Sequence, residues 1–94
     1  MREIALSVVW LTRESFAAHK CLDPAGLPAT YDEWLRDAES GVKQLEEEGF
    51  SPERVVIDPT AFAGWCAANG RKADSSARAA FVAEVHKRIM IARR

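Results

Sequence analysis

The stretch ERVVIDPTAFAGWCAANG, residues 53–70, decides the fold of this 94-residue chain. Its run Arg54–Ile57 is rich in β-branched residues, which favours a short buried strand. Asp58 can accept the free backbone N–H groups of a first helical turn, and Pro59 suits the first helical position because it lacks an N–H. Gly70 can adopt the left-handed conformation that ends a helix. The stretch therefore predicts a strand, a tight turn, a helix and a stop.

Residues 2–11 fit two local structures. Ile4, Leu6, Val8 and Trp10 alternate with smaller side chains, as in a strand, while Ile4, Val8 and Leu11 also fall at helical spacing. The Val-Val-Trp content favours the strand. Two short strands form only a marginal sheet in water. We therefore expect that the strands around residues 3–9 and 53–57 pair inside a helical shell, or that a second copy completes a sheet edge.

Helices are predicted over residues 12–21, over 31–48 and from 74–76 towards the C-terminus, besides the one after Pro59. The helix over 31–48 has the strongest signals: Thr30 and Glu33 predict a capping box, and Gly49 a left-handed stop, with Phe50 folding back onto the last turn. With these elements the chain is expected to be a single α+β domain, residues 1–94, that is small and mainly helical, with about four helices and one or two short strands.

Charge is divided along the chain although the net charge is only −1. Residues 31–48 carry seven acidic side chains against two basic ones, and residues 71–94 carry seven basic ones against two acidic ones. The pattern predicts two solvated helix faces of opposite sign, which neutralise each other within one copy or between copies.

No catalytic or metal-binding pattern stands out. His19 with Cys21 and His86 with Cys66 match no standard zinc spacing, and the Ser, Cys and His residues show no spacing that forces a nucleophilic site. Asp58 and Ser75 are explained as helix caps. We therefore expect a protein that is not an enzyme and that needs no cofactor and no metal.

Two scattered cysteines and the absence of a secretion signal are typical of a cytoplasmic protein. The apolar run from Ala5 to Leu11 is too short to cross a bilayer, so no membrane association is expected.

The candidate contact residues are one tryptophan and a set of basic side chains. Trp34 and Trp65 lie on apolar helix stripes and are expected in the core, whereas Trp10 is less constrained and is the expected contact. A helix-turn-helix over residues 59–88 is disfavoured because Arg71 occupies a position that such motifs usually bury. Nucleic-acid binding would use the basic residues Arg71, Lys72, Arg78, Lys87, Arg88, Arg93 and Arg94.

Two stretches, LPATYDEWLRDAESG (Leu27–Gly41) and VVIDPTAFAGWCAANGRKADSSARAAFVAE (Val55–Glu84), resemble a group of short uncharacterised bacterial proteins that share YDEWL and IDPxAFxxWCxxNG. The resemblance implies a bacterial cytoplasmic domain and brings no activity, cofactor or catalytic residue. The chain is expected to be a small non-enzymatic protein–protein interaction module, such as an inhibitor or an adaptor. Its partner is expected to be another protein or a second copy of the chain. Nucleic-acid binding is the alternative.

Overall fold

The computed structural model describes residues 4–92, which form four helices and two strands. In chain order these are β1 (Ile4–Trp10), α1 (Arg13–Leu22), α2 (Tyr31–Glu47), β2 (Phe50–Val56), α3 (Pro59–Ala68) and α4 (Ser75–Ala92). The predicted α+β class with about four helices is confirmed. The choice of a strand for the first segment is confirmed as well, since β1 is extended throughout.

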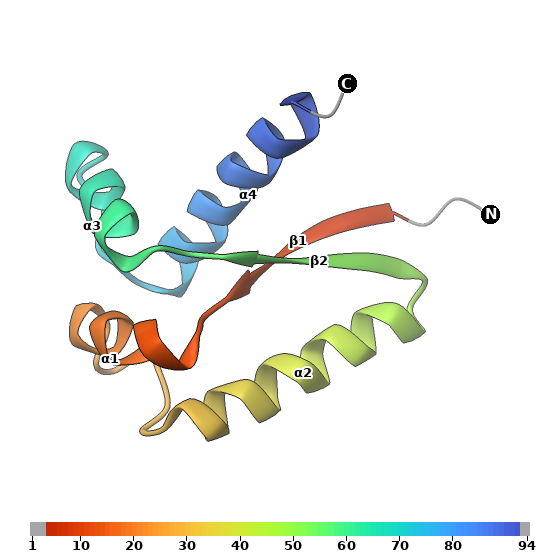
Figure 1. The fold of residues 1–94 in the computed structure, drawn as a ribbon, viewed down its shortest axis with the longest axis horizontal. Coiled ribbons are helices and arrows are strands. Elements are labelled where there is room, and N and C mark those ends of the chain that lie inside the picture. Colours follow the sequence, from red (N-terminus) through yellow and green to blue (C-terminus); the bar gives the residue numbers. More distant parts are fainter. Residues whose placement is uncertain (1–3, 93–94) are drawn as a thin grey trace.

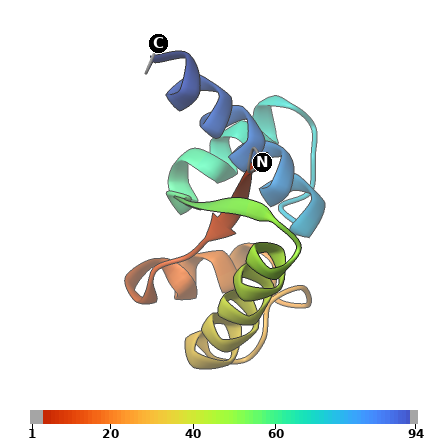
Figure 2. The ribbon, with the colours of Figure 1, turned by 90° about the vertical axis from the view of Figure 1, so that its right-hand side faces the viewer.

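The two strands pair in parallel, in a register that runs from Ile4 opposite Phe50 to Trp10 opposite Val56. Parallel strands need a long crossover connection, which α1 and α2 supply. Figures 1 and 2 show the resulting layers: α1 and α2 lie on one side of the sheet, and α3 and α4 lie on the other. The chain therefore forms a two-stranded ribbon between two pairs of helices.

β2 begins at Phe50, three residues before the predicted strand. Phe50 was expected to fold back onto the end of the preceding helix, and Pro52 is a poor strand residue in isolation. The difference has a tertiary cause, because the pairing with β1 extends through both positions.

The core consists of two groups of buried side chains, one on each side of the sheet. Val9 packs against both groups and joins them. The group beside α3 and α4 contains Val55, Ile57, Phe62, Cys66, Ala77 and Val82, and the group beside α1 and α2 contains Leu11, Phe16 and Leu27.

The predicted helix ends are largely present. The Asp58 carboxylate accepts the Ala61 N–H, and Gly49 and Gly70 have positive φ angles of 92° and 61°. The capping box predicted for α2 is only half formed. The Glu33 N–H donates to the Thr30 hydroxyl, but no hydrogen bond returns from the exposed Glu33 side chain to the Thr30 backbone.

Candidate functional site

Trp10, the predicted contact residue, is half-buried in an aromatic row with side chains of α2. Its ring meets that of Trp34 edge to face at 5.2 Å, and Trp34 in turn stacks on Tyr31 at 5.6 Å. The Arg54 guanidinium lies 4.6 Å from the centre of the Trp10 ring. Trp10 is therefore held by contacts within the chain, and only part of its surface is open to a partner.

Trp34 and Trp65, expected in the core, are both half-buried. The Trp65 indole N–H donates to the Glu84 carboxylate at 2.9 Å, and its ring packs beside Phe81. A tryptophan that keeps its polar N–H near the surface in this way is typical of an amphipathic position.

The predicted basic residues do not form one patch. Arg71 and Lys72 are exposed in the turn before α4, while Lys87 and Arg88 are exposed near its other end. Arg88 is paired with Glu84 at 3.0 Å, and the Arg71 guanidinium lies over the Trp65 ring at 5.6 Å. Arg93 and Arg94 lie outside the described residues.

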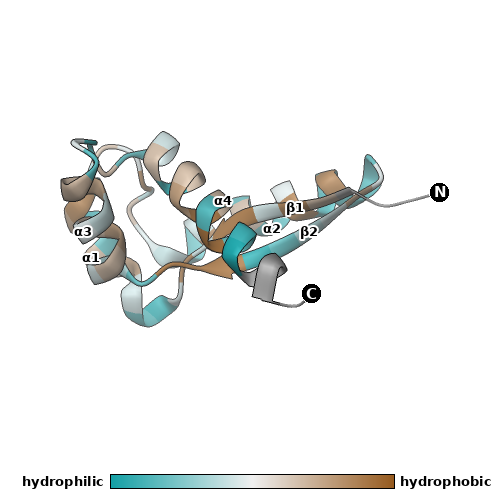
Figure 3. Ribbon diagram, turned by 90° about the horizontal axis from the view of Figure 1, so that it is seen from above, coloured by the Kyte–Doolittle hydropathy of each residue, from teal (hydrophilic) through white to brown (hydrophobic). Residues whose placement is uncertain are grey.

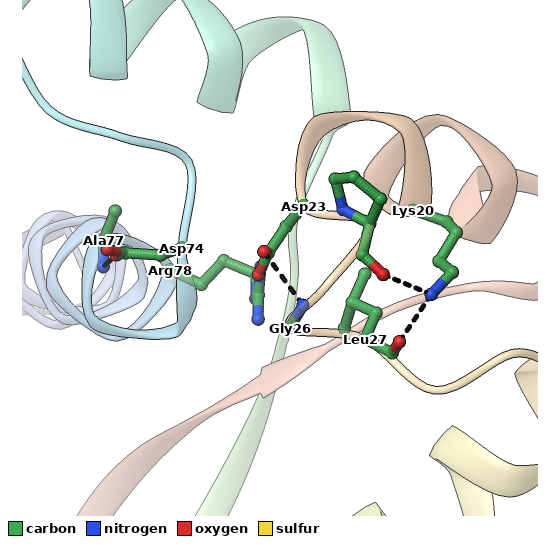
Figure 4. A network of polar contacts seen from close by, with 8 residues as sticks. Lys20, Asp23, Gly26, Leu27, Asp74, Ala77 and Arg78 are labelled. Atoms are coloured by element: carbon green, nitrogen blue, oxygen red, sulfur yellow. Dashed lines mark hydrogen bonds and ion pairs between the residues drawn. The ribbon is translucent and has the colours of Figure 1, made fainter.

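Arg78, the remaining basic candidate, is buried with 5% of its surface exposed. Its guanidinium donates to the Asp23 carboxylate at 2.9 Å, and Asp23 also accepts the Gly26 N–H (Figure 4). Lys20 fastens the same loop by donating to the carbonyls of Pro24 and Leu27, each at 2.6 Å. Arg78 therefore joins α4 to the loop after α1 and is not part of an exposed surface.

The acidic helix α2 and the basic helix α4 lie on opposite sides of the sheet (Figure 1). Among residues 4–92, no ion pair joins α2 to α4. On α2, Asp32 forms an ion pair with Arg13 of α1 at 2.8 Å. The two charged helices therefore do not neutralise each other within one copy.

His19 is a buried residue whose environment the sequence does not indicate. It is 1% exposed on α1, and its Nε2–H donates to the Ile57 carbonyl at 3.1 Å. Nδ1 is buried without a hydrogen-bond partner among the described residues. Burial lowers the pKa of His19 below its ordinary value, and the Arg78 charge acts in the same direction, while the bond to Ile57 opposes them.

The other histidine joins α4 to the sheet. His86 Nε2 lies 2.6 Å from a Glu53 carboxylate oxygen, with the imidazole 13% exposed. Across the residues that the structure covers, no group of three or more His, Cys, Asp or Glu side chains is placed to hold a metal ion. None of the described helices is long and apolar enough to cross a membrane.

A mainly apolar pocket of about 350 Å³ lies between α1 and α3. Cys21 is exposed at this site, whereas Cys66 is buried in the core, where desolvation raises the pKa of its thiol. The pocket is lined by Ala18, Cys21, Leu22, Pro59, Thr60 and Ala63.

The outer edge of β1 is an unpaired row of backbone groups. The Ile57 N–H donates to the Trp10 carbonyl, so Trp10 and every second residue before it face β2. The backbone groups of Ala5, Ser7 and Val9 consequently face away from β2. They make no hydrogen bond to another part of residues 4–92. The sequence predicted, as one of two alternatives, a sheet edge that a second copy completes. It did not indicate which backbone groups form that edge, because this depends on the direction of pairing.

The outer edge of β2 differs in its chemistry. Here Pro52 faces outward and has no N–H to offer, and Arg54 follows at the next outward position. Proline and charged side chains are common devices that prevent a sheet edge from pairing. β1 has neither, and Figure 3 shows the contrast between the mainly hydrophobic β1 and the hydrophilic middle of β2. The ribbon thus has one edge suited to pairing and one edge that is protected.

The comparisons with known proteins agree with an uncharacterised family. Residues 1–91 match a family model described as a domain of unknown function, DUF8829. No curated protein and no solved structure matches the chain significantly.

Proposed function

Since the chain belongs to the DUF8829 family, a domain of unknown function, we propose from its geometry that it is a non-enzymatic protein-interaction module. It binds an extended protein segment along the outer edge of β1. The observation that supports this role is the unpaired backbone row of Ala5, Ser7 and Val9, which an added strand would satisfy. Addition of a strand to a sheet edge is a common mode of peptide recognition, in which backbone hydrogen bonds supply affinity.

The side chains around this edge favour an apolar partner. β1 carries no charged residue, and Leu6, Val8 and Trp10 are all half-buried on one face of the strand. An extended segment with alternating apolar residues would cover them further. An inhibitor or adaptor role, and the bacterial cytoplasmic setting that the resemblance implies, are parts of the same proposal.

The test is a selection from a random-peptide display library against the immobilised protein. We expect extended, uncharged binders that perturb the amide resonances of Ala5, Ser7 and Val9 more strongly than those of Leu6 and Val8, which bond to β2. Binders that perturb only residues distant from β1, or the absence of any binder to a monomeric chain, would contradict the proposal.

Nucleic-acid binding, the alternative, has weaker support in the geometry. Of its seven candidate residues Arg78 is buried, and the exposed ones described are divided between the two ends of α4. A gel-shift assay at low salt tests this alternative, because phosphate contacts weaken steeply as salt increases.

A further inference from the structure

We propose that the strand bound at the edge of β1 is the β1 strand of a second copy, so that two chains form one four-stranded sheet. This inference rests on the proposed function, because it names the partner of the same edge. In the dimer, the two β1 strands run antiparallel across a two-fold axis, and each β2 lies at an outer, protected edge.

The spacing of the outward groups fits such an axis. Ala5 and Val9 lie two residues on either side of Ser7, so an antiparallel pair centred on Ser7 places Ser7 opposite Ser7 and Ala5 opposite Val9 of the second copy. Directly opposite residues whose N–H and C=O groups face the partner exchange two hydrogen bonds, which gives about six bonds over the three pairs. All outward-facing backbone N–H and C=O groups between residues 5 and 9 would then be hydrogen-bonded to the second copy.

The side chains are compatible with this self-pairing. Between Ala5 and Leu11 no residue is charged, so two copies of the strand meet without repulsion. Between the hydrogen-bonded pairs, Leu6 faces Val8 of the second copy, which places two aliphatic side chains in cross-strand contact. An interface of identical, self-complementary surfaces closes at two copies and leaves no free end for further growth.

The chain also exposes more surface than a compact fold of its mass. Its exposed area is 6322 Å², whereas a compact monomer of this mass exposes roughly 5,400 Å². A partner at the open edge of β1 would cover part of this surface.

The charged helices make a different dimer conceivable, with α2 of one copy against α4 of the other. In the antiparallel sheet dimer the two-fold axis is perpendicular to the sheet, so α4 lies on the same side as its copy and no α2–α4 contact forms. The two arrangements differ in their salt dependence. The sheet dimer is insensitive to salt, whereas a dimer held by charge dissociates as salt screens it.

The decisive variant removes one outward N–H without changing any side chain. Cys21 allows a synthetic peptide of residues 1–20 to be ligated to residues 21–94, so the Ser7 amide can be N-methylated in the full chain. By symmetry this change removes two intermolecular bonds, and we expect the dimer to weaken by about 30-fold. The ligated, unmethylated chain is the matched control, and N-methylation at Val8, which faces β2, is expected to disrupt the fold instead.

The readouts are the solution mass by light scattering and amide hydrogen exchange across a dilution series. The expected result is a salt-insensitive dimer in which the Ser7 and Val9 amides are protected, and a folded chain whose dimer dissociation constant is about 30-fold higher when Ser7 is N-methylated. A dissociation constant that N-methylation of Ser7 leaves unchanged, or a dimer that dissociates in salt, overturns the inference. A wild-type chain that stays monomeric overturns it too. It leaves the proposed function to the peptide selection, because a monomer presents the edge of β1 unoccupied.

Discussion

Arg78 and Asp23 form a buried ion pair, with guanidinium and carboxylate 2.9 Å apart and side chains only 6% and 14% exposed. The two residues are 55 positions apart, so the pair joins α4 to the loop that follows α1. Since α4 lies on one side of the sheet and α1 on the other, this pair links the two helical layers directly. Its position makes it a structural element of the fold.

Replacing Arg78 with methionine should leave the Asp23 charge buried without its partner. We expect the free energy of unfolding to fall by about 3 kcal/mol, measured by urea titration. The matched control is Arg71→Met, at an exposed arginine of the turn before α4, with an expected change within about 0.5 kcal/mol. Equal losses in the two variants would show that the buried pair contributes no more than a surface arginine.

The buried ring of His19 should make stability depend on pH. Because its pKa in the folded chain lies below the ordinary value of 6.5, the unfolded chain binds more protons at this residue just below pH 6.5. The neutral ring makes its full contribution to the free energy of unfolding above pH 6.5. This contribution is lost as the pH falls from 6.5 towards the lower pKa of His19 in the folded chain.

To test this, the free energy of unfolding is measured in the wild type and in His19→Gln. The measurements run from about pH 8 to about pH 5, which spans the ordinary histidine pKa. Glutamine keeps an N–H donor and does not titrate, so the variant should lose less stability over this range than the wild type. His86 is present in both proteins, so the difference between the two profiles reports on His19. Parallel profiles would contradict the prediction.

The contact between Trp10 and Trp34 should contribute a measurable coupling energy. The rings meet edge to face at 5.2 Å, an arrangement worth about 1 kcal/mol beyond area burial. A double-mutant cycle with Trp10→Leu and Trp34→Leu, followed by urea titration, measures this coupling. Additive losses would show that the two rings stabilise the chain independently.

The half-formed cap of α2 gives two unequal expectations. Thr30→Ala removes the hydroxyl that accepts the Glu33 N–H, so it should cost about 1 kcal/mol. Glu33→Ala should cost at most a few tenths of a kcal/mol, because the Glu33 side chain makes no hydrogen bond back to Thr30 and only its favourable charge near the helix N-terminus is lost. Thermal unfolding of the two variants would distinguish this arrangement from a complete capping box, in which both side chains contribute.

Two glycines, one inside α2 and one just after it, should respond to alanine in opposite directions. A Cβ added at Gly41 would meet no other atom within 4 Å, so Gly41→Ala should stabilise the chain by about 0.5–1 kcal/mol. Gly49 has a φ of 92°, so Gly49→Ala should destabilise it by about 1 kcal/mol or more. Urea titration of both variants checks the two signs.

Much of the fold could be predicted because its signals are local. Thr12, Thr30 and Asp58 each accept a backbone N–H at the start of a helix, and Gly49 and Gly70 end two of them. Such caps depend on residues within four positions of each other, so the sequence contains all the information they need.

The features that were not predicted depend on distant pairing. The parallel direction of the strands, and with it the open edge of β1, follows from how α1 and α2 cross the sheet. The buried roles of Arg78 and His19 depend on Asp23 and Ile57, which lie far away in the sequence. A basic residue in a helix gives no local sign that its partner is in another layer, so Arg78 was grouped with exposed bases.

The parallel register has a consequence for synthesis of the chain. Ile4 pairs with Phe50, so β1 leaves the ribosome well before its partner strand exists. At about 5–20 residues per second, an uncharged, β-branched strand waits for seconds with both of its edges unpaired. During that interval α1 and α2 are the only described elements available to shield it, and a nascent chain is most exposed to aggregation before β2 emerges.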